Sequence, residues 1–438
     1  MTTSLQNHYD VIIVGGRPAG ASLAVRLGQQ GLRVLLLERA VFPCPHPASS
    51  PIIYASAMAL LDEIGADETD YARNTPRITR WINEFYDQFR SYVAVPEAFG
   101  RNYGYAIDRA HFDDVLWRMA AAQPTVTARQ PFAVTDLRWE GDTVTGITGQ
   151  APGGPTENFT ADCVIGADGR FSTIAQKVSA QTHDLHNETP TTVYYATWKN
   201  AQPCDDQGAV VHFCKPSNGY FFFLFDTANG LVNVAMEGKT TLFSPGPGQV
   251  DAFYMDMIRR HPLIWQRLTQ AERIGPVRGM RNVGNLYRTA GGPGWALVGD
   301  ALHQKDPIDG QGIYDALFTA KALSQQITAW KKDGKPWAQT IQDYHTAVYA
   351  ETYPMYKATL DQVKQMIYTD TPPVLFRLFG ADDELNERYA LLTVRAISPK
   401  NWLPASTLLR AVGRGVLENL RNFLTHKPHP AEIQQSEK

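Results

Sequence analysis

The first forty residues alternate between apolar runs and a helical pattern. An apolar run over Tyr9–Val14 predicts a buried strand, helical spacing follows over Ala19–Gln30, and a second apolar run covers Arg33–Leu37. Two buried strands joined by one helix are typical of a βαβ unit. The sequence therefore predicts that the chain begins as an α/β domain with a parallel sheet.

The middle of the chain changes character. Before residue 178 the pattern predicts helices over 57–64 and 112–122 and a short buried strand over 163–165. It also predicts a hairpin over 133–148 that turns at Gly141-Asp142. From Thr192 to Glu237, β-branched and aromatic runs are separated by Gly, Pro and Asn-Gly, which predicts strands. A β-rich insertion therefore interrupts the α/β pattern.

The α/β pattern then returns. Trp295–Val298 predicts a buried strand, a helix is expected from about Gly312 to Ile327, and the chain is mostly helical from Trp337. Helical interruptions are expected at the prolines Pro354, Pro372-Pro373, Pro399 and Pro404. The polar residues after Lys427 predict a disordered tail.

The first strand ends in a glycine-bearing turn that is typical of a pyrophosphate site. Gly15 permits a tight turn, Gly20 permits close approach of helix and strand, and Glu38 ends the second strand where a carboxylate can accept from ribose hydroxyls. Arg17 replaces the usual middle glycine, so its side chain must point away from the cofactor or reach round to a phosphate. The candidate contacts are Gly15, Gly16, Arg17, Ala19, Gly20, Glu38 and Arg39.

Two further motifs follow predicted strands. Cys163–Ser172 contains Asp168-Gly169, and Ala296–His303 contains Gly299-Asp300. With the turn at Gly15, they resemble in order the three motifs of the FAD-dependent aromatic hydroxylase superfamily, which includes para-hydroxybenzoate hydroxylase and, more distantly, geranylgeranyl reductases and flavin halogenases.

The resemblance implies FAD as cofactor, with NADPH or NADH as reductant. By similarity, Asp168 and Gly169 lie beside the cofactor and Asp300 holds the ribityl chain. The residues expected to line the flavin ring are Pro307, Gly310, Gln311 and Gly312. Arg109 resembles a family arginine that reaches the cofactor, although an exposed helix arginine is an equal alternative. His303 is a candidate for proton transfer near the flavin or a structural donor.

Two departures indicate a divergent branch. The family often has Asn where this chain has Tyr314, and the arginine that commonly closes the second motif is absent near Ala175 and Gln176. We expect a Rossmann-like FAD-binding domain from 1–178 and 276–345, a β-rich substrate domain over 179–275, and a helical region over 346–438. The segment 76–105 is a candidate to join the sheet of the substrate domain.

The inserted domain is expected to hold the substrate on the strand Tyr220–Phe225. In a strand, Tyr220, Phe222 and Leu224 share one face, which we assign to the substrate pocket, although all six side chains could equally be core. An aromatic pocket favours an apolar or aromatic small molecule.

Three functions compete. The leading one is a monooxygenase that uses NAD(P)H and O₂. The first alternative is a geranylgeranyl reductase-like reduction of isoprenoid double bonds, but the Trp and Phe-Pro expected there are replaced by Phe222 and by Leu224-Phe225-Asp226. The second is a flavin-binding sensor without turnover. No tryptophan pair has the spacing expected of a halogenase.

Composition narrows the partners. A formal net charge of −3 gives no reason to expect nucleic acid. The four cysteines fall singly, as expected of buried thiols in a reducing cytoplasm, and metal ligation is not expected. No apolar run is long enough to span a bilayer. Trp402–Leu424 is expected to form a helix that packs on its own domain, with peripheral contact with a bilayer as the alternative. Monomer and homodimer remain open.

Overall fold

The computed structural model describes residues 8–45, 49–86, 89–372 and 382–425. The chain forms two compact units. The first unit consists of Met1–Thr75, Ile107–Glu188 and Val283–Leu360, and the second of Pro76–Ala106, Thr189–Asn282 and Asp361–Lys438. The segment 346–438, expected to form one helical region, is thus divided between the units at Leu360.

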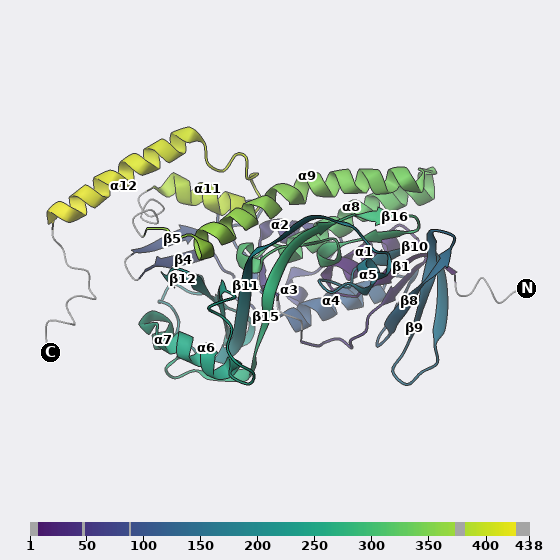
Figure 1. Ribbon diagram of the computed structural model, residues 1–438, viewed down its shortest axis with the longest axis horizontal. Coiled ribbons are helices and arrows are strands. Elements are labelled where there is room, and N and C mark those ends of the chain that lie inside the picture. Colours follow the sequence, from purple (N-terminus) through teal and green to yellow (C-terminus); the bar gives the residue numbers. More distant parts are fainter. Residues whose placement is uncertain (1–7, 46–48, 87–88, 373–381, 426–438) are drawn as a thin grey trace, which may run out of the picture. The chain divides into compact units, whose positions relative to one another are not determined.

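The first unit is built on a mainly parallel sheet (Figure 1). Its strand order is β16-β17-β10-β1-β2-β7, and a hairpin of β8 and β9 extends from β10. The bounds are β1 His8–Val14, β2 Val34–Leu37, β7 Val126–Arg129, β8 Ala133–Glu140, β9 Thr143–Gln150, β10 Glu157–Gly166, β16 Gly291–Gly292 and β17 Trp295–Leu297. All four residues of β2 are buried, which is why parallel strands read as continuous apolar runs.

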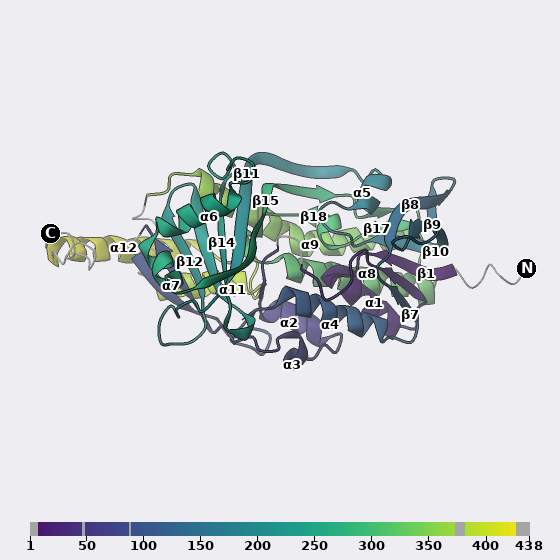
Figure 2. The same cartoon turned by 90° about the horizontal axis from the view of Figure 1, so that it is seen from below.

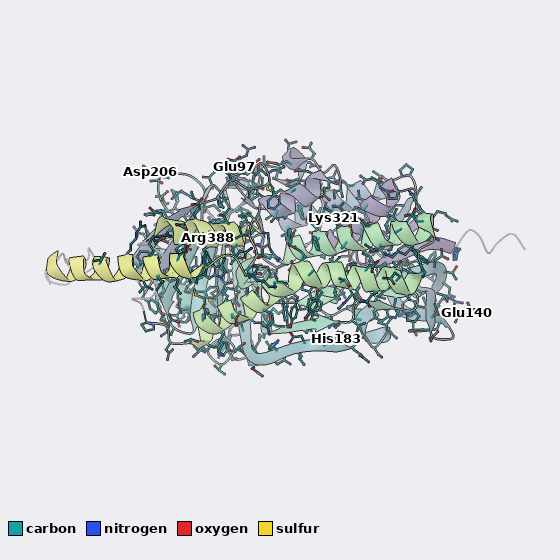
Figure 3. The ribbon with its side chains drawn as sticks, turned by 90° about the horizontal axis from the view of Figure 1, so that it is seen from above. Glu97, Glu140, His183, Asp206, Lys321 and Arg388 are labelled. Carbon is teal, nitrogen blue, oxygen red and sulfur yellow. The ribbon has the colours of Figure 1, made fainter. Side chains whose placement is uncertain are left out.

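Helices flank this sheet, and α1 contacts both α4 and α8. The bounds are α1 Pro18–Gln29, α2 Ala55–Asp62, α3 Glu68–Tyr71, α4 Arg109–Ala121, α5 Thr173–Lys177, α8 Gly312–Asp333 and α9 Trp337–Val363. Figure 3 labels Lys321 on α8 and Glu140 at the end of β8. The predicted βαβ unit and the hairpin at Gly141-Asp142 are confirmed.

The interruption expected at Pro354 is wrong, because this proline lies inside α9. Proline removes one intrahelical hydrogen bond, but packing on both sides holds the helix. The Tyr344 hydroxyl donates to Leu297 O at 2.7 Å, and Tyr356 is fully buried. Pro373 and the tail after Lys427 lie outside the described residues.

The second unit is built on a mainly antiparallel sheet (Figure 2). Its order is β18-β15-β11-β14-β13-β12-β4-β5, with β4 parallel to β12 and with the edge strand β18 (His303–Gln304) contributed by residues of the first unit. The bounds are β4 Arg80–Phe85, β5 Phe89–Ala94, β11 Thr182–Lys199, β12 Val211–Ser217, β13 Tyr220–Asp226, β14 Val232–Lys239 and β15 Glu272–Arg288. Residues 76–106 therefore add β4 and β5 to this sheet. The long strands β11 and β15 each contain residues of both units.

Four α-helices of the described residues belong to the second unit: α6 Val250–Arg259, α7 Pro262–Leu268, α11 Asp383–Thr393 and α12 Ala405–Thr425. α6 and α7 share a hydrophobic core with the sheet, to which Tyr254 and Ile264 contribute from the helices and Met236 from β14. Within the described part of the chain, no helix is long and apolar enough to cross a membrane.

Candidate cofactor-binding site

The carboxyl ends of four parallel strands lie in one row of the first unit. Val14 is in register with Leu37 on one side and Gly166 on the other, and Gly166 is in register with Leu297. The glycine turn at Gly15 and the pairs Asp168-Gly169 and Gly299-Asp300 of the other two motifs lie just beyond this row. In open α/β sheets, ligands bind at this edge.

The turn after β1 is closed so tightly that only glycine fits. Gly15 has φ +107°, and its N–H donates to Leu37 O at 2.8 Å. A Cβ on Gly15 would lie 2.4 Å from Ala167 O, and one on Gly20 only 1.8 Å from Gly15 O. Both glycines are therefore required by close backbone approach.

The amino terminus of α1 has the properties of an anion site. Arg17 occupies the N-cap and makes no side-chain capping bond, Pro18 follows it, and the first turn contains no acidic residue. The first N–H groups of a helix have no intrahelical partner, and the helix dipole favours negative charge there. A pyrophosphate fits this terminus.

The Arg17 side chain is bonded to a carboxylate on α4. Its Nη1 donates to Asp113 Oδ2 on α4 at 2.5 Å, and Asp113 also accepts from Arg109 Nη2 at 3.1 Å. Arg109 Nη1 in turn donates to Ser49 Oγ at 2.5 Å. Both arginines thus meet at the fully buried Asp113, a partner that the sequence reasoning missed.

Glu38 is fixed at the end of β2. Its Oε2 accepts the N–H of Gly16 at 2.8 Å, and its Oε1 accepts the N–H of Ala40 at 2.9 Å. Each carboxylate oxygen retains a lone pair that a ribose hydroxyl could use. The neighbouring Arg39 is exposed.

Asp168 has a local structural role. Its carboxylate accepts from Ser172 Oγ at 2.5 Å and from the N–H groups of Thr173 and Ile174 at 2.7 and 3.2 Å, so it caps α5. Burial raises the pKa of Asp168. Gly169 has φ +78°, and nothing lies within 4 Å of a Cβ placed there.

The third motif lies against α1 and is bonded to the second. A Cβ on Gly299 would lie 3.0 Å from Ala19 Cβ. Next to it, Asp300 Oδ2 lies 3.3 Å from Arg170 Nε, and Arg170 Nη2 donates to Lys305 O at 2.6 Å. Arg170 stands in the second motif, but only the fold shows that its side chain links both motifs.

Buried charges hold the loop that follows. Lys305 Nζ lies 2.6 Å from Asp309 Oδ2 and 2.8 Å from Asp315 Oδ2, and His303 Nε2 lies 3.4 Å from the same Asp315 oxygen. Asp309 Oδ1 also accepts the N–H of Gln311 at 3.1 Å. The loop therefore presents its glycines in a fixed conformation.

This loop runs from Pro307, which begins a 3-10 turn, through Gly310 at φ +66° to Gly312, where α8 begins. Tyr314, the departure from the family pattern, donates its hydroxyl to Glu351 Oε1 at 2.8 Å on α9. Its side chain therefore ties α8 to α9.

Among the buried polar atoms beside these motifs, Arg170 Nη1 and His303 Nδ1 make no hydrogen bond with any residue of the described segments. Buried polar atoms are normally satisfied. An uncapped helix terminus, a carboxylate at the second strand end and unsatisfied atoms near Asp300 together fit a molecule with a pyrophosphate, riboses and a polar ring. FAD has these groups.

The substrate prediction changes with the structure. Phe222 and Leu224 are fully buried in the core shared with α6 and α7, and Tyr220 packs against that core, where its hydroxyl lies 2.9 Å from His261 Nε2. This face of β13 is occupied by the helices, so it is not a pocket. The alternation in the sequence could not tell which face the helices would cover.

The opposite face carries an aromatic cluster, consisting of Phe85, Phe213, Phe221, Phe223 and Phe225, whose neighbouring ring centroids lie 5.1–5.7 Å apart. Lys215 follows Phe213 on β12 by two residues and is in register with Phe85. It is fully buried, and its Nζ donates to Ser217 O at 2.9 Å and lies 5.3 Å from the Tyr86 ring centroid. Burial lowers the pKa of Lys215 to about 8.

Comparison with known proteins agrees with this site. A family model described as an FAD binding domain matches residues 8–347. The digeranylgeranylglycerophospholipid reductase of Methanospirillum hungatei is 26% identical over 347 residues, which cover 78% of this chain and 81% of that protein.

Two solved structures share the fold. The flavin-dependent brominase Bmp2 matches with a TM-score of 0.76 and 19% identity over 93% of this chain and 98% of its own. The p-nitrophenol 4-monooxygenase PnpA from Pseudomonas putida matches with a TM-score of 0.72 and 18% identity over 89% of this chain and 98% of its own. The chain therefore belongs to the FAD-binding-domain family, and it is an FAD-dependent oxidoreductase with a digeranylgeranylglycerophospholipid reductase among its relatives.

Proposed function

We propose that the protein is a monooxygenase that uses NAD(P)H and O₂ to hydroxylate or epoxidise an aromatic or otherwise apolar small molecule. The observation that carries the proposal is the aromatic cluster of the second unit with Lys215 buried beside it. Phenyl rings select an aromatic substrate, and a buried ammonium selects one with an acidic group.

The residues of the first unit supply binding and orientation. The α1 terminus after Gly15 binds the pyrophosphate, Glu38 a ribose, and Asp300 with Arg170 the ribityl chain. When bound, FAD supplies the transfer of hydride and the activation of oxygen. N–H groups of the loop from Pro307 to Gly312 can donate to the ring's carbonyl oxygens.

The test is a coupled measurement of NAD(P)H oxidation and oxygen uptake by the purified, FAD-loaded protein. Simple phenols and aromatic acids should stimulate both at a ratio near one to one, with a hydroxylated product detected by mass spectrometry. Uncharged aromatic analogues of the same size serve as control substrates and should stimulate NAD(P)H oxidation and oxygen uptake less. NAD(P)H oxidation that no candidate substrate changes would instead support a flavin-binding sensor.

Reduction of isoprenoid double bonds is the second candidate, favoured by the name of the curated relative from Methanospirillum hungatei. The same assay separates the two reactions, because double-bond reduction proceeds without oxygen. Turnover of a geranylgeranyl substrate in an anaerobic cuvette, with a product two mass units heavier per bond, would favour this candidate over the monooxygenase.

Lys215→Met should raise stability at neutral pH. Below pH 8 the buried lysine is charged in both the folded and the unfolded state. The shift of its pKa from 10.5 to about 8 then lowers the free energy of unfolding by roughly 3 kcal/mol. Between those values the folded state loses its proton first, so wild-type stability rises with pH. The variant should therefore exceed the wild type at pH 7, and the difference should shrink towards pH 10.5.

Denaturant unfolding of both proteins at several pH values measures this difference. Lys331→Met is the matched control, since this lysine is paired with Asp10 and Asp162. These partners raise the pKa of Lys331, so Lys331→Met should be less stable than the wild type at pH 7.

If Lys215 binds an acidic substrate, Lys215→Met should also raise the KM for aromatic acids at least tenfold. The KM for uncharged substrates should stay nearly unchanged.

A further inference from the structure

The second unit contains a cysteine, a histidine and a glutamate arranged in series. Cys204 lies between β11 and β12, and its Sγ is 3.8 Å from His212 Nδ1. His212 Nε2 lies 2.7 Å from Glu84 Oε2 on the neighbouring strand β4. Asp206, labelled in Figure 3, belongs to the same loop as Cys204.

Burial differs along this series in a way that suits a reactive thiol. The side chains of His212 and Glu84 are only 2% and 4% exposed. Cys204 and Cys44 are partly exposed, contrary to the expectation that all four cysteines are buried, whereas Cys163 and Cys214 are buried. A reagent can therefore reach the sulfur while the two groups behind it are shielded from water.

The hydrogen bonds define the role of each group. Ionised Glu84 only accepts, so His212 donates its Nε2–H to it, and in the neutral ring Nδ1 then carries the lone pair that faces Cys204. Transfer of the thiol proton to Nδ1 gives a thiolate beside an imidazolium, whose charge Glu84 stabilises. This is the arrangement that activates a nucleophilic cysteine.

The charges around the series favour the ion pair. Burial opposes a charged ring, but hydrogen bonds with Cys204 and Glu84 raise the pKa of His212. Glu84 is also paired with Arg90 on β5. Nearby, Arg80 is paired with Asp205 and Arg267 with Asp226, and the exposed Asp206 adds one more carboxylate to the loop of Cys204.

We propose that Cys204 is a nucleophilic modification site, activated by His212 and Glu84, that reacts with hydrogen peroxide. The thiolate attacks one peroxide oxygen, an S–O bond forms and the O–O bond breaks. The sulfur is oxidised by two electrons to sulfenic acid, and the leaving hydroxide takes the proton of the His212 imidazolium and departs as water. The proposal does not depend on which reaction the flavin performs.

Alkylation by iodoacetamide between pH 6 and 9.5 tests the activation, with the full-length protein and peptide mass mapping of Cys204. An ordinary thiol has a pKa of about 8.5 and is only a few per cent thiolate at pH 7. Cys204 should therefore react at pH 7 roughly tenfold faster in the wild type than in His212→Asn, and the two rates should converge at pH 9.5.

His261→Asn is the matched control, because it removes a partly buried histidine of the same unit that is bonded to Tyr220 rather than to a thiol. It should leave the Cys204 rate unchanged. If His212→Asn does not fold, as judged by circular dichroism, the alkylation rate of Cys204 is compared between the wild type and Glu84→Gln, together with the wild-type pH profile. A wild-type rate that follows an ordinary thiol titration overturns the proposal.

Peroxide tests the chemistry itself. Treatment with hydrogen peroxide followed by dimedone should label Cys204 in the wild type at pH 7. The amount of label should fall about tenfold in His212→Asn, and this site should carry no label in Cys204→Ser. Absence of the adduct at Cys204 under conditions that label free cysteine would show that the site does not react with peroxide.

Discussion

Gly20→Ala should give a protein that is purified without yellow colour. The new Cβ would lie 1.8 Å from Gly15 O and 3.1 Å from Ala167 Cβ, so either α1 moves away from the sheet edge or the turn opens. Both changes displace the N–H groups that would hold the pyrophosphate. An overpacking cost of about 3 kcal/mol corresponds to a loss of roughly hundredfold in FAD affinity.

Titration of the apoprotein with FAD, followed by flavin fluorescence, measures this affinity. Gly413→Ala is the matched control: it also lies in a helix, but nothing lies within 4 Å of a Cβ placed there. It should bind FAD as the wild type does and be slightly more stable, since alanine favours the helix. Wild-type FAD affinity in Gly20→Ala would contradict the placement of the pyrophosphate at this turn.

Asp300→Ala should weaken FAD binding by roughly ten- to hundredfold, because a hydrogen bond to a charged group contributes about 1.5–3 kcal/mol. The substitution removes the proposed ribityl contact and also leaves Arg170 Nε without its carboxylate. Asp300→Asn keeps an acceptor and should lose less.

Equilibrium binding of FAD distinguishes this effect from a general loss of stability if unfolding is measured in parallel. Asp256→Ala removes a carboxylate from an exposed ion pair with Arg260 on α6, and its FAD affinity should match the wild type. An Asp300→Ala protein that binds FAD normally would show that the third motif does not hold the ribityl chain.

Much of the first unit could be predicted from the sequence because its signals are local. A buried parallel strand, a glycine turn and a terminal carboxylate follow one another within thirty residues, and each has a distinct residue pattern. The structure accordingly shows β1, α1 and β2 within one or two residues of the predicted bounds.

Contacts between distant segments could not be predicted in this way. Arg17 and Arg109 are 92 residues apart, and only the packing of α4 on α1 shows that both meet at Asp113. Likewise, alternation along β13 gave two faces of equal apolar character. Only the position of α6 and α7 decides that Phe222 belongs to the core that they share with the sheet.

The parallel sheet of the first unit is completed out of sequence order. β10 ends at Gly166, but its neighbour β17 begins at Trp295, and the chain between them includes most of the second unit's sheet. The first residues of the outer edge of β10 pair with β9, but Val164–Gly166 pair with β17, and at ribosomal rates of about 5–20 residues per second they wait on the order of ten seconds for this partner. During synthesis the nascent chain therefore exposes an apolar strand edge, which makes it a candidate client for chaperones that bind early.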